Sequence, residues 1–282
     1  MPQTLCDIVH YKEHVVANDV GAVSCYGDVW LLDCHIVMCG DARKYADMQL
    51  LMQNHKADMV FTDPPYNVAY KGCVRDSFEK DEYHKLLNNS FGNIAKFIKN
   101  TASLYICHNA KWQRELQSVL EANNFVIRNQ IVWLKNHFVL SFARYKSKHE
   151  LIFYCHLQGK RDAWYGNKAS HNTWQIARNH KNLFHPTDKP IALISKAMTN
   201  SSRKYDLILD SFAGGGSTLM ACEKLQRRAR VMEINEHYVD VMIRRWHHTT
   251  GMPSILLHTK QNIDLLGKSF AEINRIRQRV LS

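Results

Sequence analysis

The sequence alternates short apolar runs with longer amphipathic stretches, and this alternation limits the folds open to the chain. Residues 57–63, ADMVFTD, form one apolar run, and residues 205–210, YDLILD, form another. Helix-like stretches of about 10 to 20 residues separate most of the runs, a spacing typical of βαβ units and a parallel sheet. We therefore predict an α/β fold with a doubly wound, mostly parallel sheet and helices on both of its faces.

The expected elements cover most of the chain from residue 29 to residue 248. We expect strands at residues 29–32, 35–39, 57–63, 102–108, 125–135, 149–156, 205–210 and 229–234. We expect helices at residues 42–55, 81–100, 110–124, 188–202, 216–226 and 235–248, and a basic amphipathic helix at residues 271–282. Residues 1–27 show no such periodicity, so we predict an N-terminal arm there and a single domain over residues 28–282.

Composition narrows the class of partner. The 282 residues include 37 Lys and Arg against 26 Asp and Glu, which gives a formal net charge of +11. A strongly basic surface attracts polyanions, so nucleic acid is the leading candidate, although many basic proteins bind none. The eight cysteines form no C-x-x-C pair, so we predict free thiols and no metal site. With no apolar run near the roughly 18 to 20 residues of a membrane span and no signal peptide, we expect a cytoplasmic protein without membrane contact.

A glycine-rich turn follows one of the predicted strands. The glycine run at residues 214–216 connects the strand that ends at Asp210 with a helix that starts near Ser217. Glycines at such a turn let backbone amides approach a ligand at the helix N-terminus. The next strand ends at Glu233, an acid suited to the two hydroxyls of a ribose. Together the two strand ends predict a site for a nucleoside-bearing cofactor; a tight turn followed by an ordinary surface acid is the alternative.

The motif DPPY, residues 63–66, follows another strand. In an open α/β sheet, ligands bind outside the carboxyl ends of the strands, so this motif and the glycine turn can face one crevice. Pro64 and Pro65 form a rigid turn with carbonyl acceptors, and Asp63 adds an anionic acceptor. Tyr66 offers a flat face on which a nucleobase can stack. These residues suit an amino group on an aromatic ring; a purely structural turn is the alternative.

These motifs, in this order, resemble those of the amino DNA methyltransferases that use S-adenosylmethionine. DPPYN at residues 63–67 is similar to the family's catalytic motif, and residues 210–218 and 231–235 are similar to its glycine loop and ribose acid. GDA at residues 40–42 resembles the motif for the cofactor adenine, and HPTDKPIALI at residues 185–194 resembles the motif that seats the methionine end of the cofactor. The catalytic motif precedes the glycine motif, which is the order of the family's β group.

The resemblance implies a Rossmann-like fold and a site-specific enzyme that methylates N6 of adenine by direct attack from a base flipped out of duplex DNA. It implies catalytic roles for Asp63, Pro64, Pro65 and Tyr66. It implies cofactor contacts by Asp41, Ala42, Asp63, His185, Lys189, Asp210, Phe212, Ala213, Gly214, Gly216, Ser217, Thr218, Glu233 and Ile234. Aspartate at position 63 is more typical of adenine-directed members than of those acting on cytosine N4. Methylation of cytosine N4 or of RNA, and a catalytically silent DNA-binding relative, stay open.

Recognition of the target sequence is expected from an insertion at approximately residues 135–187. Its aperiodic part, residues 156–187, is too long for an ordinary connection. The candidates for contacts with double-stranded DNA are basic and aromatic: Lys146, Lys148, Lys160, Arg161, Trp164, Lys168, Trp174 and Arg178. Residues 27–42 resemble the start of phage and prophage modification methylases, which implies expression in a bacterial host and a place in restriction-modification. Members of this group are often dimers, so a homodimer is also expected.

The sequence departs from the family pattern in the glycine loop. Ser211 stands where the family usually has proline, and Gly216 with Ser217 replaces a commoner Gly-Thr. Both are exchanges between small residues, so we expect the shape of the loop to be kept. The nicotinamide-binding fingerprint G-x-G-x-x-G is not met by GGGSTL at residues 214–219, which disfavours an oxidoreductase.

Overall fold

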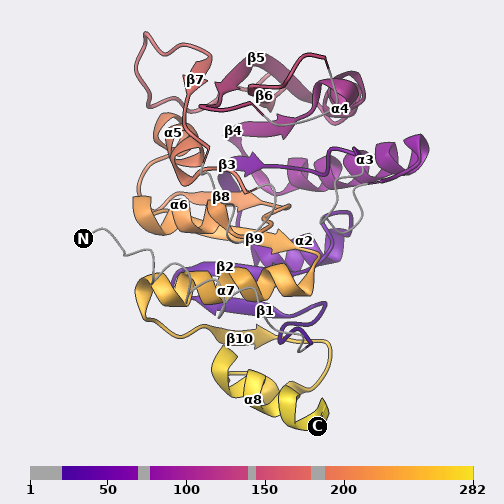
Figure 1. The fold of residues 1–282 in the computed structure, drawn as a ribbon, viewed down its shortest axis with the longest axis vertical. Coiled ribbons are helices and arrows are strands. Elements are labelled where there is room, and N and C mark those ends of the chain that lie inside the picture. The colour runs from indigo at the N-terminus through magenta and orange to yellow at the C-terminus, as the bar shows by residue number, and fades with distance from the viewer. Residues whose placement is uncertain (1–20, 69–76, 139–143, 179–187, 282) are drawn as a thin grey trace.

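A ten-stranded sheet runs through the molecule in the order β10-β1-β2-β9-β8-β3-β4-β6-β5-β7 (Figure 1). The computed structural model describes residues 21–68, 77–138, 144–178 and 188–281, with side chains described up to residue 277. The strands are β1 (Val29–Leu32), β2 (His35–Cys39), β3 (Ala57–Thr62), β4 (Ile98–His108), β5 (Phe125–Leu134), β6 (His149–Leu157), β7 (Thr173–Gln175), β8 (Leu207–Asp210), β9 (Arg228–Glu233) and β10 (Ile255–His258).

The centre of the sheet is parallel. Strands β2, β9, β8, β3 and β4 pair in parallel with their neighbours, and β7 pairs in parallel with β5. Antiparallel pairing of β1 with β10 and β2 extends one side of the sheet, and antiparallel pairing of β6 with β4 and β5 extends the other. Five of these nine pairs are parallel, so the predicted α/β fold with a mostly parallel sheet is confirmed.

Helices cover both faces of the sheet, as predicted for a doubly wound fold (Figure 1). They are α2 (Tyr45–Met52), α3 (Lys80–Lys96), α4 (Gln113–Ala122), α5 (Ile191–Ser201), α6 (Ser217–Leu225), α7 (Glu236–Thr250) and α8 (Phe270–Leu281), with the 3-10 helices η1 (Ala110–Trp112) and η2 (Ile263–Leu265). Helices α2, α3 and α4 share one apolar core, which includes Phe91 and Leu120. Helices α5, α6 and α7 share the other, which includes Leu219 and Met242.

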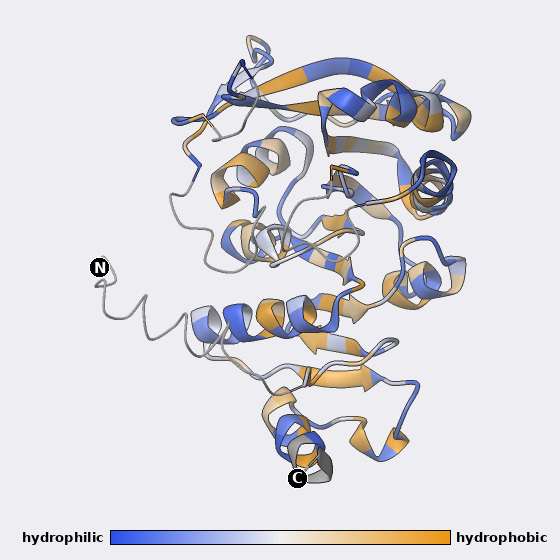
Figure 2. Ribbon diagram, turned by 45° about the vertical axis from the view of Figure 1, so that its right-hand side comes forward, coloured by the Kyte–Doolittle hydropathy of each residue, from blue (hydrophilic) through white to orange (hydrophobic). Residues whose placement is uncertain are grey.

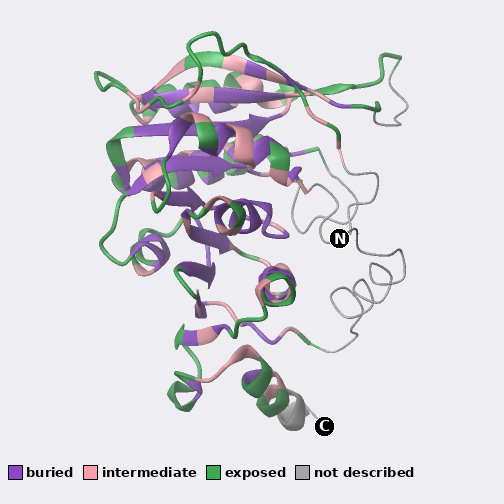
Figure 3. Cartoon of the chain, turned by 90° about the vertical axis from the view of Figure 1, so that its left-hand side faces the viewer, coloured by how far each residue is buried: buried purple, intermediate pink, exposed green. Residues whose placement is uncertain are grey.

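Burial on both faces explains the composition of the central strands. A strand between two helical layers is apolar at successive positions rather than at alternate ones. Every residue of β2 (HIVMC) and of β8 (LILD) is buried. Figure 2 shows the strands as mainly hydrophobic, and Figure 3 shows that exposed residues gather in loops and on the outer sides of helices. In α4, Val119 and Leu120 lie three and four positions after Leu116, and the three residues form the buried stripe that packs the helix against the sheet.

Several boundaries differ from the expected ones. The helix expected at residues 81–100 ends at Lys96, because Ile98 already pairs with Ala57 as the first residue of β4. Strands β7 and β10 were not expected, and each pairs at an edge of the sheet. In the described part of the predicted arm, the amides of Val23 and Ser24 donate to Asp240 at 2.7 and 2.9 Å, so this part packs on α7. Within the described residues no helix is long and apolar enough to span a bilayer.

The order of the strands predicts a crevice at the carboxyl ends of the central strands. From β3 the chain passes through α3 to β4, and from β8 it passes through α6 to β9, which lies in the opposite direction. Helices α3 and α6 belong to opposite layers, and β3 and β8 are direct neighbours. Ligands of open α/β sheets bind at such a switch point, outside the carboxyl ends of the strands. Here those ends are Thr62 and Asp210.

Candidate active site

A cavity of about 460 Å³ opens at this switch point, between the carboxyl ends of β2, β3, β8 and β9. Its lining includes these residues with predicted roles: Asp41, Ala42, Asp63, Pro64, Pro65, Tyr66, Lys189, Asp210, Phe212, Ala213, Gly214, Ser217, Thr218, Glu233 and Ile234. The prediction that the DPPY motif and the glycine turn face one crevice is therefore confirmed. Gly216 is not part of the lining, and His185 lies outside the described residues. The volume is in the range of small-molecule sites.

The DPPY turn is fixed by contacts from the residues that follow it. Asn67 has φ 52°, a left-handed conformation that asparagine tolerates better than most residues. Its side chain donates to the Phe78 carbonyl at 3.0 Å and accepts from the Phe78 amide at 2.7 Å. The indole of Trp112 donates to the Asn67 carbonyl at 3.1 Å, and the hydroxyl of Tyr83 donates to the Pro65 carbonyl at 2.7 Å. These bonds hold the turn after β3 in one conformation.

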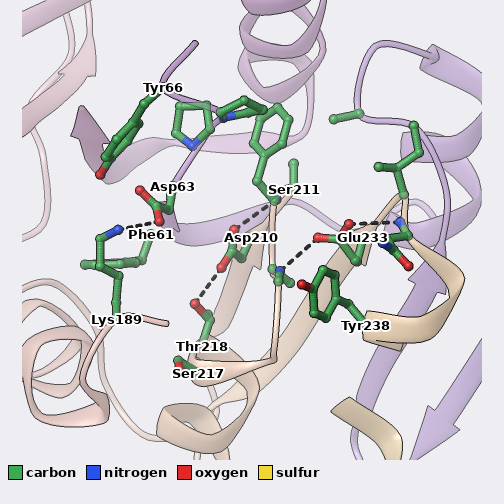
Figure 4. Close-up of a pocket in the computed structure, with 18 of the residues that line it drawn as sticks. Phe61, Asp63, Tyr66, Lys189, Asp210, Ser211, Ser217, Thr218, Glu233 and Tyr238 are labelled. Atoms are coloured by element: carbon green, nitrogen blue, oxygen red, sulfur yellow. Dashed lines mark hydrogen bonds and ion pairs between the residues drawn. The ribbon is translucent and has the colours of Figure 1, made fainter. Parts of the chain in front are cut away.

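Two acceptors at the end of β3 have no hydrogen-bond donor among the described residues. The Lys189 ammonium donates to Oδ2 of Asp63 at 2.5 Å, whereas Oδ1 is buried and has no partner among the described residues (Figure 4). No described residue donates to the Pro64 carbonyl either, in contrast to the Pro65 carbonyl. Burial raises the pKa of Asp63, and the charge of Lys189 opposes this shift. The turn thus has one carboxylate oxygen and one carbonyl oxygen that no described residue satisfies, on two residues that line the cavity.

Tyr66 forms the wall of the cavity next to these acceptors (Figure 4). Its ring is half-buried, and the Lys189 nitrogen lies 5.2 Å from the ring centroid. Its hydroxyl lies 3.5 Å from Oε2 of Glu150. Burial first, and the charge of Asp63 second, raise the pKa of Tyr66 well above its usual value, so the hydroxyl stays protonated. The ring is therefore a neutral aromatic surface beside the Asp63 carboxylate.

Asp210 connects the two strand ends. Oδ1 accepts from the Thr62 hydroxyl at 3.0 Å and from the Phe212 amide at 3.1 Å, and Oδ2 accepts from the Thr218 hydroxyl at 2.6 Å. Burial raises the pKa of this carboxyl to about 7, while the bonds from Thr218, Phe212 and Thr62 act in the opposite direction. The side chain therefore joins β3, β8 and the start of α6 into one rigid floor under the cavity.

The glycine turn depends on two backbone positions with positive φ. Gly214 has φ 51° and Gly216 has φ 84°. A Cβ atom at Gly216 would lie 2.4 Å from Cγ of Met242, so a larger residue fits there only if the Met242 side chain shifts. Arg245 then fixes the turn, because its Nη1 donates to the Gly215 carbonyl at 2.9 Å and to Asp188 at 3.3 Å. Gly216 thus shapes the cavity without lining it.

An acidic residue lies at the carboxyl end of each of the strands β9 and β2. Glu233, after β9, accepts from the amides of Gly214 and Asn235, each at 2.9 Å, and burial raises its pKa. Asp41, after β2, is held by Arg43 through bonds of 2.7 to 3.0 Å. Burial acts to raise the pKa of Asp41, but the bonds from Arg43 outweigh it and lower the pKa. Arg43 therefore belongs with Asp41 at this end of the cavity, a partner that the sequence did not indicate.

Most of the residues predicted to bind DNA lie on the surface. Lys146, Lys148, Lys160, Arg161, Trp164 and Lys168 are exposed, and Arg178 is partly exposed. Trp174 is a correction, because its side chain is 2% exposed and packs against Tyr105 in the core, with ring centroids 6.0 Å apart. Strand β7 pairs with β5, which turns the central residue of this three-residue strand inward. Trp174 therefore anchors the insertion to the sheet and is not available to stack on a base.

Two charged residues beside the motif had no predicted role. Glu150 accepts from Lys135 at 2.5 Å and lies 3.4 Å from the nitrogen of Lys189. Burial acts to raise the pKa of Glu150, but Lys189 and Lys135 outweigh it and lower the pKa to about 2. Lys135 follows β5 and Glu150 is the second residue of β6, so only the register of these antiparallel strands brings the two together. The sequence pattern does not reveal this register, so it could not predict the contact between Lys135 and Glu150.

Comparisons with known proteins agree with this geometry. The sequence pattern of the N6/N4 family described as DNA methylase matches residues 57–244. The Type II methyltransferase M2.MboI of Moraxella bovis is 28% identical over 251 aligned residues, covering 77% of this chain and 89% of that protein. M.HpaI of Haemophilus parainfluenzae, also a Type II methyltransferase, is 23% identical over 213 residues, covering 67% of this chain and 68% of that protein.

Solved structures share the fold. The M1.HpyAVI–SAM complex superposes with a TM-score of 0.60 at 22% identity, covering 74% of this chain and 97% of that one. The cytosine-N4-specific PvuII DNA methyltransferase superposes with a TM-score of 0.63 at 16% identity, covering 93% of this chain and 96% of that one. At these identities the likeness concerns the fold alone. The family pattern, however, spans more than half of the 282 residues, and the chain therefore belongs to the N6/N4 DNA methylase family.

Proposed function

We propose that the protein transfers a methyl group from S-adenosylmethionine to the N6 amino group of adenine in double-stranded DNA. The observation that carries this proposal is the pair of acceptors after β3. Oδ1 of Asp63 and the Pro64 carbonyl have no donor among the described residues, and both residues line the cavity. An amino group offers two N–H donors, one for each acceptor. Membership of the DNA methylase family supports DNA as the substrate.

The acceptors have a chemical task. The amino nitrogen of adenine is a weak nucleophile, because its lone pair is delocalised into the ring. When Asp63 and the Pro64 carbonyl each accept one N–H, the nitrogen moves toward tetrahedral geometry and its lone pair becomes available for attack. The rigid turn, fixed by Asn67 and Tyr83, keeps the two acceptors in place, and such positioning lowers the barrier further. This reaction requires no covalent bond to the protein.

The residues of the cavity fit the proposed cofactor. Glu233 lines the cavity at the end of β9, where a carboxylate suits ribose hydroxyls. Ser217, at the start of α6, has a buried hydroxyl that lines the cavity and has no partner among the described residues, so it is available to a polar group of the ligand. Asp41 and Phe212 border the part proposed for the adenine ring. Bound in this way, S-adenosylmethionine supplies the methyl group through its sulfonium.

The target base must leave the duplex to reach these acceptors. Tyr66 can stack on the flipped base and recover about 1 to 3 kcal/mol of the stacking lost from the helix. Among the predicted DNA contacts, the exposed Lys148 lies on the cavity side of the sheet, because its carbonyl accepts from the amide of Lys135 at 2.9 Å, and its charge can neutralise a phosphate there. Lys160 and Arg161 lie at the opposite end of the sheet, close to Ala163, whose amide donates to the Thr101 carbonyl near the start of β4. Trp174 has no part in this proposal, since it is buried.

Methylation of cytosine N4 is the second candidate. The same pair of acceptors can receive the amino group of cytosine, and one neighbour in fold is the cytosine-N4-specific PvuII enzyme. Aspartate at position 63 favours adenine through the motif resemblance. Mass spectrometry of nucleosides from DNA treated with the protein and S-adenosylmethionine tests the choice. We expect N6-methyladenine; N4-methylcytosine without N6-methyladenine supports the second candidate, and neither product supports a catalytically silent relative.

A further inference from the structure

The side chains of Lys189 and Glu150 form a buried charge chain behind the DPPY motif. The Lys189 nitrogen lies 2.5 Å from Oδ2 of Asp63 and 3.4 Å from Oε2 of Glu150, and its side chain is 6% exposed. The second oxygen of Glu150 accepts from Lys135 at 2.5 Å, and Lys135 is 3% exposed. Two carboxylates and two ammonium groups thus alternate in the order Lys135, Glu150, Lys189 and Asp63. A buried charge needs partners of this kind to stay ionised.

The charge chain fixes the orientation of the Asp63 carboxylate. The bond from Lys189 to Oδ2 fixes the rotation of the Asp63 carboxylate, whose side chain is 20% exposed and lines the cavity. Glu150 holds Lys189 from the other side, and Lys135 holds Glu150. Burial alone lowers the pKa of Lys189, but the carboxylates of Asp63 and Glu150 outweigh it and hold the pKa above its usual value. Lys189 therefore stays cationic at neutral pH.

We propose that Lys189 and Glu150 are positioning residues for methyl transfer, in which Lys189 holds the Asp63 carboxylate in the orientation that receives the target amino group, and Glu150 holds Lys189. This inference rests on the proposed function. It gives Lys189 a place on the base side of the cavity instead of the contact with the methionine end of the cofactor that the motif resemblance implies. The charge chain also connects the DPPY turn with the insertion, because Lys135 directly follows β5 at the start of the insertion and Glu150 lies in β6, within it.

The pH dependence of turnover separates positioning from a merely structural role. The ionisable groups that face Asp63 are Lys189, Glu150, Tyr66, Cys107, Asp188 and Asp210. Among them, Lys189 lowers the pKa of Asp63 and Glu150 raises it. Protonation of Asp63 removes the anionic acceptor, so kcat should fall at low pH, and the pH of this fall (the acid limb of the pH profile) should follow the pKa of Asp63. Loss of the lysine charge should move the limb to higher pH, and loss of the glutamate charge should move it to lower pH.

The test uses the full chain with Lys189→Met and Glu150→Gln, and two matched controls on the surface. Lys99→Met removes a lysine paired with Asp58 at the far end of β4, and Glu121→Gln removes an exposed glutamate of α4. For each protein we would measure kcat and KM for DNA from pH 5 to pH 9, the affinity for S-adenosylhomocysteine by calorimetry, and thermal unfolding. For Lys189→Met we expect kcat to fall at least about tenfold, with S-adenosylhomocysteine affinity within about threefold of the original.

Opposite displacements of the acid limb in the two variants, with both controls unchanged, support the inference. Weakened S-adenosylhomocysteine binding in Lys189→Met without a displaced limb overturns it and assigns the lysine to the cofactor. If Lys189→Met does not fold, the limb of Glu150→Gln alone decides, and an unchanged or raised limb overturns the inference. If the unsubstituted protein binds S-adenosylhomocysteine but methylates no DNA, the proposed function itself is overturned. That result is distinct from the two outcomes that overturn only the role of Lys189 and Glu150.

Discussion

Gly216 lies directly against Met242 of α7, so that a Cβ atom at this glycine would be 2.4 Å from Cγ of the methionine. Its φ of 84° is a second reason for glycine, since side chains strain the backbone in this region. The position therefore combines a conformational and a steric requirement. Both act on the turn whose amide at Gly214 donates to Glu233. A local packing contact between α6 and α7 in this way sets the shape of the proposed cofactor site.

Gly216→Ala should weaken cofactor binding and lower stability. Gly251→Ala is the matched control, because Gly251 has φ 73° but no atom lies within 4 Å of the position that a Cβ would take there. The control should lower the free energy of unfolding by about 1 kcal/mol, the usual strain of a side chain at positive φ. Gly216→Ala should lower it by more and reduce S-adenosylhomocysteine affinity, which calorimetry and denaturant unfolding would measure. Equal effects of the two substitutions would show that the contact with Met242 has no importance.

Asp63→Ala should reduce methylation to a small residual rate while leaving cofactor binding intact. The substitution removes the anionic acceptor but leaves Glu233 and the glycine turn unchanged, so S-adenosylhomocysteine should still bind. Loss of one group that stabilises developing charge typically lowers kcat by about 100- to 1,000-fold. A radiometric assay with methyl-labelled S-adenosylmethionine would measure the residual rate. Turnover close to that of the original protein would exclude Asp63 as the acceptor.

The ring of Tyr66, rather than its hydroxyl, should matter for activity. Tyr66→Phe and Tyr66→Trp keep a surface for stacking, so we expect most of the activity to survive. Tyr66→Ala should raise KM for DNA and lower kcat, in keeping with a stacking contribution of about 1 to 3 kcal/mol. Fluorescence of 2-aminopurine at the target position would report the flipped base in each variant. If all three substitutions had the same effect, the bond of the hydroxyl toward Glu150 would be the important contact instead.

The centre of this molecule was more predictable from the sequence than its edges. Strands β3 and β8 are short apolar runs, each followed by polar or turn-forming residues. The apolar run and the residues that end it are both local features of the sequence, because a buried parallel strand is apolar at successive positions. That explains why the sequence alone could place Asp63 and the glycine turn at one crevice. The end of α3 was placed too late, because the apolar residues Phe97 and Ile98 continue the helical pattern across a boundary that the pairing of Ile98 with Ala57 decides.

Contacts between distant segments were beyond the sequence pattern. Trp174 stands among polar residues, and only the pairing of β7 with β5 shows that its ring turns into the core. Lys135 and Glu150 are 15 residues apart and meet only through the register of β5 and β6. In each case the position depends on which strand is the neighbour. Hydropathy and motif spacing carry no information on that choice.

Exposed cations of the insertion should contribute to DNA affinity without setting sequence preference. We expect Lys148→Ala, at the carboxyl end of β5, and Lys146→Ala, two residues before it, each to weaken binding, and each lost phosphate contact should reduce the slope of log K against log salt by about 1. Lys99→Ala, at the far end of β4, is the control and should leave the slope unchanged. Fluorescence anisotropy of labelled duplexes at several salt concentrations would measure this. Unchanged slopes in both variants would move the DNA surface away from this part of the insertion.

The buried carboxyl of Asp210 should make stability depend on pH. Burial raises its pKa from 3.8 to about 7 in the folded protein, so between these values the folded state binds a proton that the unfolded state has released. The free energy of unfolding should therefore fall as pH rises from 4 to 7, and the contribution of this group is largest below pH 4. In Asp210→Asn this contribution is absent, so the decline over that range should be smaller by on the order of 1 to 4 kcal/mol. Urea unfolding of both proteins at pH 4, 5.5 and 7 would measure the difference, with Asp264→Asn in the exposed helix η2 as the control. A decline equally steep in Asp210→Asn would mean that Thr62, Phe212 and Thr218 hold the carboxylate ionised in the folded protein.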